Sequence, residues 1–121
     1  MPVRKILVVD DSATNRAFLS EMLSRHGYQC TTAQSGAEAI EKAKSGQPDL
    51  ILMDVVMPDM DGYQATRALV KDEQTKHIPI ILCTSKSQAT DELWGLRQGA
   101  KAYVIKPVKE KDLLSKIAAV G

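Results

Sequence analysis

The sequence contains few aromatic residues: one tryptophan, three tyrosines and one phenylalanine in a chain of 121 residues. Proteins that bind single-stranded nucleic acid stack the bases on closely grouped aromatic side chains, and no such group is present here. The charges also nearly cancel, because 16 basic and 15 acidic side chains leave a formal net charge of +1. So small a surplus gives no electrostatic argument for a nucleic acid or an anionic membrane as the main partner. We therefore expect neither as a partner.

Long apolar runs are absent as well. A helix that crosses a membrane needs about 20 apolar residues, whereas the first apolar run, from Ile6 to Val9, ends at Asp10. No signal peptide is visible at the N-terminus. We therefore expect a soluble protein of the cytoplasm.

Cysteine is equally scarce. The two cysteines, Cys30 and Cys83, lie in apolar or β-rich runs and are not spaced as a redox pair or a zinc site. We interpret both as small buried side chains.

Short β-type runs alternate along the chain with patterns typical of amphipathic helices. The runs that predict strands are Lys5–Val9, Gln29–Ala33, Leu50–Asp54, Ile80–Thr84 and Ala102–Ile105. All but the second are almost wholly apolar, as expected of strands that are covered on both faces of a parallel sheet. The second run is more polar and fits the edge of the sheet.

Helical signals fill the gaps between these runs. The predicted N-terminal caps are the capping boxes Ser35 with Glu38 and Asp61 with Gln64, and the single residue Thr90; the predicted stops are Gly27 and Gly99. Repeated units of strand and helix predict an α/β fold with right-handed crossovers, which is an open, doubly wound parallel sheet of five strands. We expect one domain, residues 1–121, and these patterns leave the strand order open.

Polar residues stand at the carboxyl ends of four predicted strands. Asp10 and Asp11 follow the first strand, Asp54 ends the third, Thr84 ends the fourth, and Lys106 follows the fifth. Doubly wound sheets bind their ligands beyond these ends of the strands. The sequence therefore predicts that three carboxylates, a hydroxyl and an ammonium group share one cleft.

Three carboxylates in one cleft repel each other, and burial strengthens the repulsion. The cluster becomes tolerable when a cation shares it, and oxygen ligands without histidine or thiolate favour Mg²⁺. Lys106 and Thr84 beside them indicate a phosphoryl group, whose charge Lys106 would neutralise and to which Thr84 would donate a hydrogen bond.

These residues, Asp10-Asp11, Asp54, Thr84 and Lys106-Pro107, resemble the phosphoacceptor constellation of response-regulator receiver domains of the CheY-like type. The resemblance covers the whole chain. It implies a flavodoxin-like sheet of order 2-1-3-4-5 and a phosphorelay function in which Asp54 is the phosphoacceptor. It also implies a histidine kinase as phosphodonor and a cis Lys106–Pro107 bond. The implied Mg²⁺ ligands are Asp11, Asp54, the backbone carbonyl of Val56, and Asp10 through water.

The resemblance further implies a switch. Thr84 would move toward the phosphoryl group, and Tyr103 would swing inward to fill the space that it leaves. The face formed by the fourth helix, the fifth strand and the fifth helix would then change its affinity for a target protein. We expect a monomer without an output domain, which catalyses only its own phosphorylation and dephosphorylation. In the implied strand order Cys30 and Cys83 lie about 14 Å apart, too far for a disulfide, which needs Cα atoms within about 7 Å.

A narrower resemblance rests on the segment from Trp94 to Ala100, which is similar to receivers of the PilH kind that serve type IV pilus motility. Motility of this kind or chemotaxis is therefore the expected pathway. Trp94 itself fits either core packing or contact with a partner. Val56 and Lys86 flank the expected path of the attacking water, and from them we expect slow to moderate self-dephosphorylation.

Three other functions compete with this interpretation. The chain could be a receiver cut from a larger regulator with a DNA-binding or enzymatic output. A phosphatase with an aspartate nucleophile forms the same acyl phosphate, but it needs a second acid where Val56 stands. A receiver-shaped module that never accepts phosphate usually lacks part of the acceptor set, which is complete here.

Overall fold

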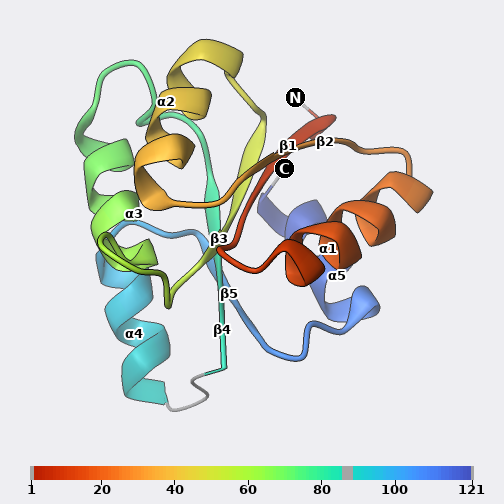
Figure 1. Cartoon of the computed structure of the whole chain (residues 1–121). Helices are drawn as coiled ribbons and strands as arrows, with labels where there is room; N and C mark the ends of the chain where they lie inside the picture. Colours follow the sequence, from red (N-terminus) through yellow and green to blue (C-terminus); the bar gives the residue numbers. More distant parts are fainter. Residues whose placement is uncertain (1, 86–88, 121) are drawn as a thin grey trace.

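A computed structural model of the chain describes residues 2–85 and 89–120, the side chains of residues 89–92 excepted. Strands and helices alternate along it (Figure 1). The strands are β1 (Lys5–Val9), β2 (Gln29–Ala33), β3 (Leu50–Asp54), β4 (Ile80–Thr84) and β5 (Ala102–Ile105). The helices are α1 (Ala13–Arg25), α2 (Gly36–Gly46), α3 (Gly62–Lys71), α4 (Ala89–Arg97) and α5 (Glu110–Val120). The strand bounds are those that the sequence predicted.

The strands form one parallel sheet in the order β2-β1-β3-β4-β5. This confirms the implied topology and places the more polar β2 at an edge. The order reverses at β1, which pairs with β2 on one side and with β3 on the other. Ligands of such sheets bind at this reversal, beyond the carboxyl ends of β1 and β3.

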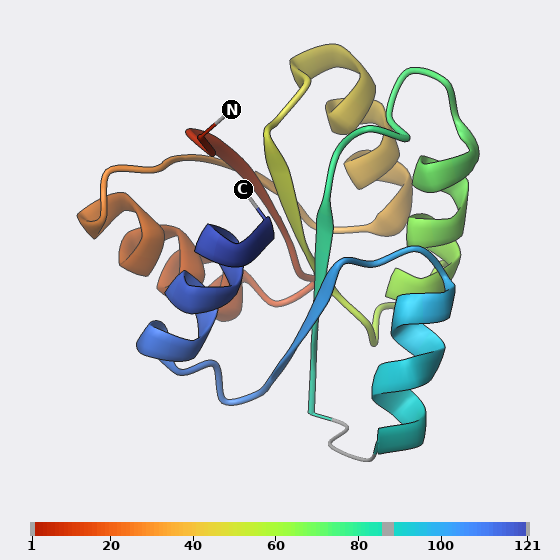
Figure 2. The ribbon, with the colours of Figure 1, turned by 180° about the vertical axis from the view of Figure 1, so that it is seen from behind.

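Helices cover both faces of the sheet. Helices α1 and α5 lie on one face, and α2, α3 and α4 lie on the other, as the two opposite views show (Figures 1 and 2). Successive residues of a strand point to opposite faces, so Leu7 and Val9 join the core beneath α2 and α3, whereas Ile6 and Val8 join the core beneath α1 and α5. Burial on both faces explains why these strands are apolar at nearly every position.

The helix caps confirm some local predictions and correct others. Asp61 and Gln64 form the complete capping box, with bonds of 2.9 and 3.0 Å. At α2 the Ser35 hydroxyl accepts from the Glu38 N–H at 3.1 Å. The Glu38 carboxylate, however, accepts from the N–H of Gln34 and not from that of Ser35. The second half of that predicted box is therefore wrong by one residue.

The structure gives α4 as Ala89–Arg97, directly after residues 86–88, which it does not describe. The side chain of Thr90, the predicted cap, also lies outside the described part of the chain, so its role as a cap stays a prediction. The predicted stops are confirmed, because Gly27 and Gly99 have φ angles of 88° and 115°, which glycine adopts without steric penalty.

Both cysteines are free, as expected. Cys83 is fully buried in β4, whereas Cys30 is only half-buried in the edge strand β2. Strands β1 and β3 separate them. Within the described residues, no helix combines the length and the apolar character needed to cross a lipid bilayer.

Candidate functional site

The three predicted acids meet at the carboxyl edge of the sheet. Asp10 follows β1, Asp54 ends β3, and each of Asp10, Asp11 and Asp54 offers a carboxylate oxygen within 4.8 Å of the other two. Asp10 and Asp54 are 1% and 5% exposed, whereas Asp11 is open to solvent. The sheet topology therefore assembles residues that are 44 positions apart into one acidic cluster.

Lys106 directly follows β5, the edge strand opposite β2, and its side chain reaches this cluster. Its ammonium lies 2.8 Å from Oδ1 of Asp54 and 3.2 Å from Oδ2 of Asp10. The Lys106 backbone N–H donates to the carbonyl of Thr84 at 2.7 Å, and the following bond to Pro107 is cis, as the resemblance implied. Lys106 thus bridges two of the three carboxylates.

Burial and neighbouring charges shift the pKa values of this pair. Burial raises the pKa of Asp54; the hydrogen bond from Lys106 opposes that effect, and the charge of Asp10 adds to it. Burial acts to lower the pKa of Lys106, but its hydrogen bond to Asp54 and the charges of Asp54 and Asp10 outweigh it, so the Lys106 pKa stands above its ordinary value. Lys106 is therefore a charged counter-ion at neutral pH.

The cluster fits a hard divalent cation. Asp10, Asp11 and Asp54 supply only oxygen ligands, which suit Mg²⁺. Three carboxylates with one ammonium leave two negative charges on these four groups, and a divalent ion balances them. Asp10 has both oxygens engaged, since Oδ1 accepts from the Ser12 N–H at 2.9 Å and Oδ2 from Lys106.

Thr84 ends the strand next to β3, whereas Tyr103 lies further back in β5, opposite Leu82 of β4. Thr84 is the last residue of β4 and is 1% exposed. Tyr103 in β5 is 4% exposed, and its ring lies against α4, 3.4 Å from where a Cβ on Gly95 would stand. Tyr103 therefore already occupies an inward position in this structure.

Of the two residues expected to flank the attacking water, the structure describes only Val56. Val56 follows β3 in the loop to α3 and is 62% exposed. Lys86 lies outside the described residues.

Asp49, an acid near the site in sequence, has a local role: its carboxylate accepts from the backbone N–H groups of Arg4 and Lys5 at 2.9 Å. It is not part of the cluster.

Trp94 has a mixed environment. Its side chain is about half exposed, and its ring meets that of Tyr63 edge-on, with centroids 6.5 Å apart and an interplanar angle of 81°. Tyr63 belongs to α3, so Trp94 lies on the flank of α4 that faces α3. It is thus neither a fully buried core residue nor a fully exposed one.

One residue near the cluster was missed in the sequence. The guanidinium of Arg16 donates to the backbone carbonyl of Asp10 at 2.7 Å. Its only signal was position, because Arg16 stands one turn after the Ser12 cap and therefore near the start of α1.

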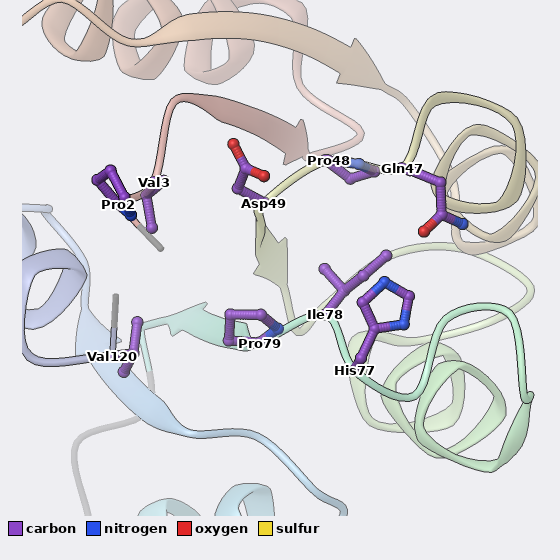
Figure 3. Close-up of a pocket in the computed structure, with 9 residues that line it drawn as sticks. All are labelled: Pro2, Val3, Gln47, Pro48, Asp49, His77, Ile78, Pro79 and Val120. Atoms are coloured by element: carbon purple, nitrogen blue, oxygen red, sulfur yellow. The ribbon is translucent and has the colours of Figure 1, made fainter.

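A separate hollow of about 400 Å³ lies at the amino-terminal ends of the strands, next to both chain ends (Figure 3). Its walls combine apolar residues, such as Pro79 and Val120, with the polar Gln47, Asp49 and His77. No residue that the sequence predicted for the site lines it. The acidic cluster at the opposite end of the sheet is therefore the candidate site.

Comparison with known proteins identifies the family. A family model for the response regulator receiver domain matches residues 6–118. The chain belongs to this family. The receiver domain is 49% identical over 116 residues to the protein PilH of Pseudomonas aeruginosa, a match that covers 96% of each chain. Several other curated relatives are longer, and the chain spans only between 25% and 49% of their length.

Solved structures agree with this assignment. The receiver domain matches the chemotaxis protein CheY4 of Vibrio cholerae with a TM-score of 0.91 and 34% identity, over 98% of this chain and 99% of that one. It also matches the receiver domain of the sensor histidine kinase PA1611 of Pseudomonas aeruginosa, with a TM-score of 0.88 and 32% identity over 97% and 96% of the two chains. That structure has a magnesium ion coordinated in its active-site cleft.

Proposed function

We propose that this receiver domain is a single-domain response regulator of a two-component phosphorelay, which accepts a phosphoryl group on Asp54 and signals by altered binding to another protein. The observation that carries the proposal is the ammonium of Lys106, which bridges Asp54 and Asp10 at the mouth of the acidic cluster. Such an ammonium can neutralise the charge of the carboxylate and, after transfer, the charge of the phosphoryl group attached to it.

The metal ligands that we propose are Asp11, Asp54 and the backbone carbonyl of Val56. Asp10 would act through water, because its two oxygens already accept bonds from Ser12 and Lys106. When bound, Mg²⁺ would supply positive charge to the oxygens of the phosphoryl group. The magnesium ion in the related PA1611 receiver supports this choice of metal.

The transfer is a displacement at phosphorus. One carboxylate oxygen of Asp54 forms a bond to phosphorus, and the bond from phosphorus to the donor's leaving group breaks. That leaving group is the histidine nitrogen of a kinase or the acetate of acetyl phosphate. The hydrogen bond from Lys106 favours the ionised, nucleophilic form of Asp54 against the effect of burial, and the Thr84 hydroxyl would donate to the phosphoryl group.

The output that we propose is a change of one protein surface. Phosphorylation adds negative charge and acceptor oxygens at Asp54. Thr84 and Tyr103 would relay it to the face formed by α4, β5 and α5, where Ile105 is already 43% exposed. Similarity to the chemotaxis protein CheY4 supports a target in chemotaxis, and the PilH-like segment from Trp94 to Ala100 favours type IV pilus motility as the other pathway. We further propose that the domain acts in the cytoplasm as a monomer.

The absence of an output domain is also a proposal. The match to PilH, which covers 96% of that protein, supports a domain that works alone and turns over no other substrate. The longer relatives support the alternative of a larger regulator with its own output. The size of the natural gene product distinguishes the two.

Acetyl phosphate tests the nucleophile. We expect the wild-type protein to gain one phosphoryl group by mass spectrometry in the presence of Mg²⁺, and Asp54→Asn to gain none. Asp59→Asn is the matched control: Asp59 lies in the loop after β3, is exposed, and has a φ of 68°, which asparagine tolerates. It should label like the wild type. Labelling of Asp54→Asn, or a wild type that stays unlabelled, would contradict the proposal.

A further inference from the structure

Every hydrogen-bonding group of Asp10 has a partner. Its N–H donates to the carbonyl of Ala33 at 3.1 Å, and its carboxylate oxygens accept from Ser12 and Lys106. Its backbone carbonyl accepts from the guanidinium of Arg16 at 2.7 Å. Asp10 is therefore held on all sides, and one of the four contacts comes from the guanidinium of Arg16 on helix α1.

The bond from Arg16 replaces a lost partner in the sheet. Strand β1 ends at Val9, so the carbonyl of Asp10 lies beyond the last pair of the parallel ladder. Asp10 is 1% exposed, and a buried carbonyl without a donor is costly. Helix α1, capped by Ser12, carries the partly buried Arg16 to this carbonyl.

That carbonyl belongs to the peptide unit that joins Asp10 to Asp11. The unit is planar, so a donor that fixes its oxygen also fixes the N–H and the Cα of Asp11. The Asp11 side chain is exposed, and α1 begins two residues after it. The orientation of this peptide therefore sets the direction from which the Asp11 carboxylate enters the cluster.

We propose that Arg16 is a positioning residue, which holds the Asp10–Asp11 peptide so that the Asp11 carboxylate is aimed at the divalent cation before the cation arrives. The inference rests on the proposed function, because it concerns the metal affinity of that same site. Arg16 does not touch the metal or the phosphoryl group in this scheme and acts only through the backbone.

Removal of Arg16 changes the Mg²⁺ affinity in opposite directions, depending on whether Arg16 acts through its charge or by positioning the peptide. A positive charge close to the cluster repels a divalent cation, so if charge alone mattered, its loss would tighten Mg²⁺ binding. If Arg16 positions the Asp10–Asp11 peptide, its loss weakens Mg²⁺ binding. Residues that orient metal ligands typically contribute about 10- to 100-fold to affinity. The sign of the change therefore separates the two roles.

Calorimetric titration of the full chain with MgCl₂ tests this sign. We expect Arg16→Met to weaken Mg²⁺ binding by about tenfold. Arg16→Lys should weaken it by less, because an ammonium keeps the charge and can donate a bond but lacks the rigid fork of the guanidinium. The control is Arg25→Met, on the same helix, whose exposed side chain pairs with Glu21 and Glu110 at 3.6 Å. It should bind Mg²⁺ like the wild type.

A folded Arg16→Met variant that binds Mg²⁺ as tightly as the wild type, or more tightly, overturns the inference, even if its melting temperature is lower. If that variant does not fold, Arg16→Lys decides by the same criterion. Both results leave the proposed function intact, because the wild type still binds Mg²⁺ and is labelled at Asp54. A wild type that binds no Mg²⁺ overturns both.

Discussion

Gly62 offers the sharpest test of how the fold holds Asp54. It is the first residue of α3, and its N–H donates to the carbonyl of Val55 at 2.8 Å. A Cβ added to it would stand 2.2 Å from the carbonyl oxygen of Asp54 and 2.8 Å from the Cα of Val55. The start of α3 therefore rests on the end of β3, directly behind the phosphoacceptor.

The size of the effect follows from this geometry. Ordinary contacts of a Cβ lie at 3.4–4 Å, so α3 and β3 would have to separate by about 1 Å in Gly62→Ala. Backbone atoms cannot swing aside, so we expect a loss at the upper end of the range for overpacked sites, about 3 kcal/mol. For a domain of this size that corresponds to a fall of about 10 °C in melting temperature.

Two other glycines complete a graded series. At Gly36 a Cβ would meet the Met60 sulfur at 2.9 Å, but that flexible side chain can move, and we expect a loss below about 1 kcal/mol. At Gly46, the last residue of α2, a Cβ would meet nothing within 4 Å. Gly46→Ala should be neutral or stabilise the protein by up to about 1 kcal/mol, because alanine favours the helix.

Thermal unfolding followed by circular dichroism measures the series. The rate of labelling by acetyl phosphate, at a temperature where each variant is folded, gives a second reading. Gly62→Ala should label more slowly, because the backbone of Asp54 must move, whereas Gly46→Ala should label like the wild type. If Gly62→Ala melts with the wild type, or if the three variants melt together, the reasoning from close backbone approach is wrong.

Three further substitutions test electrostatics and a buried hydrogen bond. In metal-free protein, Asp54→Asn should gain stability relative to wild type as the pH rises from 3.8 through the raised pKa of Asp54, because the wild type must then ionise a buried carboxylate. Asp49→Asn should show the opposite trend. Backbone N–H groups of Lys5 and Arg4 lower the pKa of Asp49, so its contribution is present above pH 3.8 and is lost as the pH falls through its folded pKa. Urea unfolding at a series of pH values measures both, and parallel curves would refute the assignment. Thr75→Val should lose about 1–2 kcal/mol, because the buried Thr75 hydroxyl donates to the carbonyl of Leu69 at 2.7 Å; an unchanged urea midpoint would count against it.

Local composition was sufficient to locate the strands and the acids. Strands buried on both faces are apolar at nearly every position, so runs such as Leu50–Asp54 stand out without any knowledge of their neighbours. Because parallel strands point the same way, polar residues at their carboxyl ends share one edge of the sheet. That rule brought Asp10, Asp54 and Lys106 together before any contact was known. The strand order came from the resemblance and was confirmed by the pairing of β1 with both β2 and β3.

Cap predictions were less reliable, because they depend on where the chain enters the helix. Ser35 and Glu38 have the spacing of a capping box, but the Glu38 side chain reaches the N–H of Gln34. Thr90, the predicted cap of α4, has a side chain outside the described residues, so that prediction is not tested. Sequence patterns locate such boundaries only to within one or two residues.

Contacts between elements were not encoded in any spacing along the chain. The bond from Arg16 to the Asp10 carbonyl, the approach of Gly62 to Asp54, and the edge-on packing of Trp94 on Tyr63 all depend on how a helix lies on the sheet or on its neighbour. A residue's type limits what it can bond to, but its partner is chosen by packing, in which the whole core takes part. The identity of the acidic site was therefore readable from the chain, whereas the way its backbone is held became visible only in three dimensions.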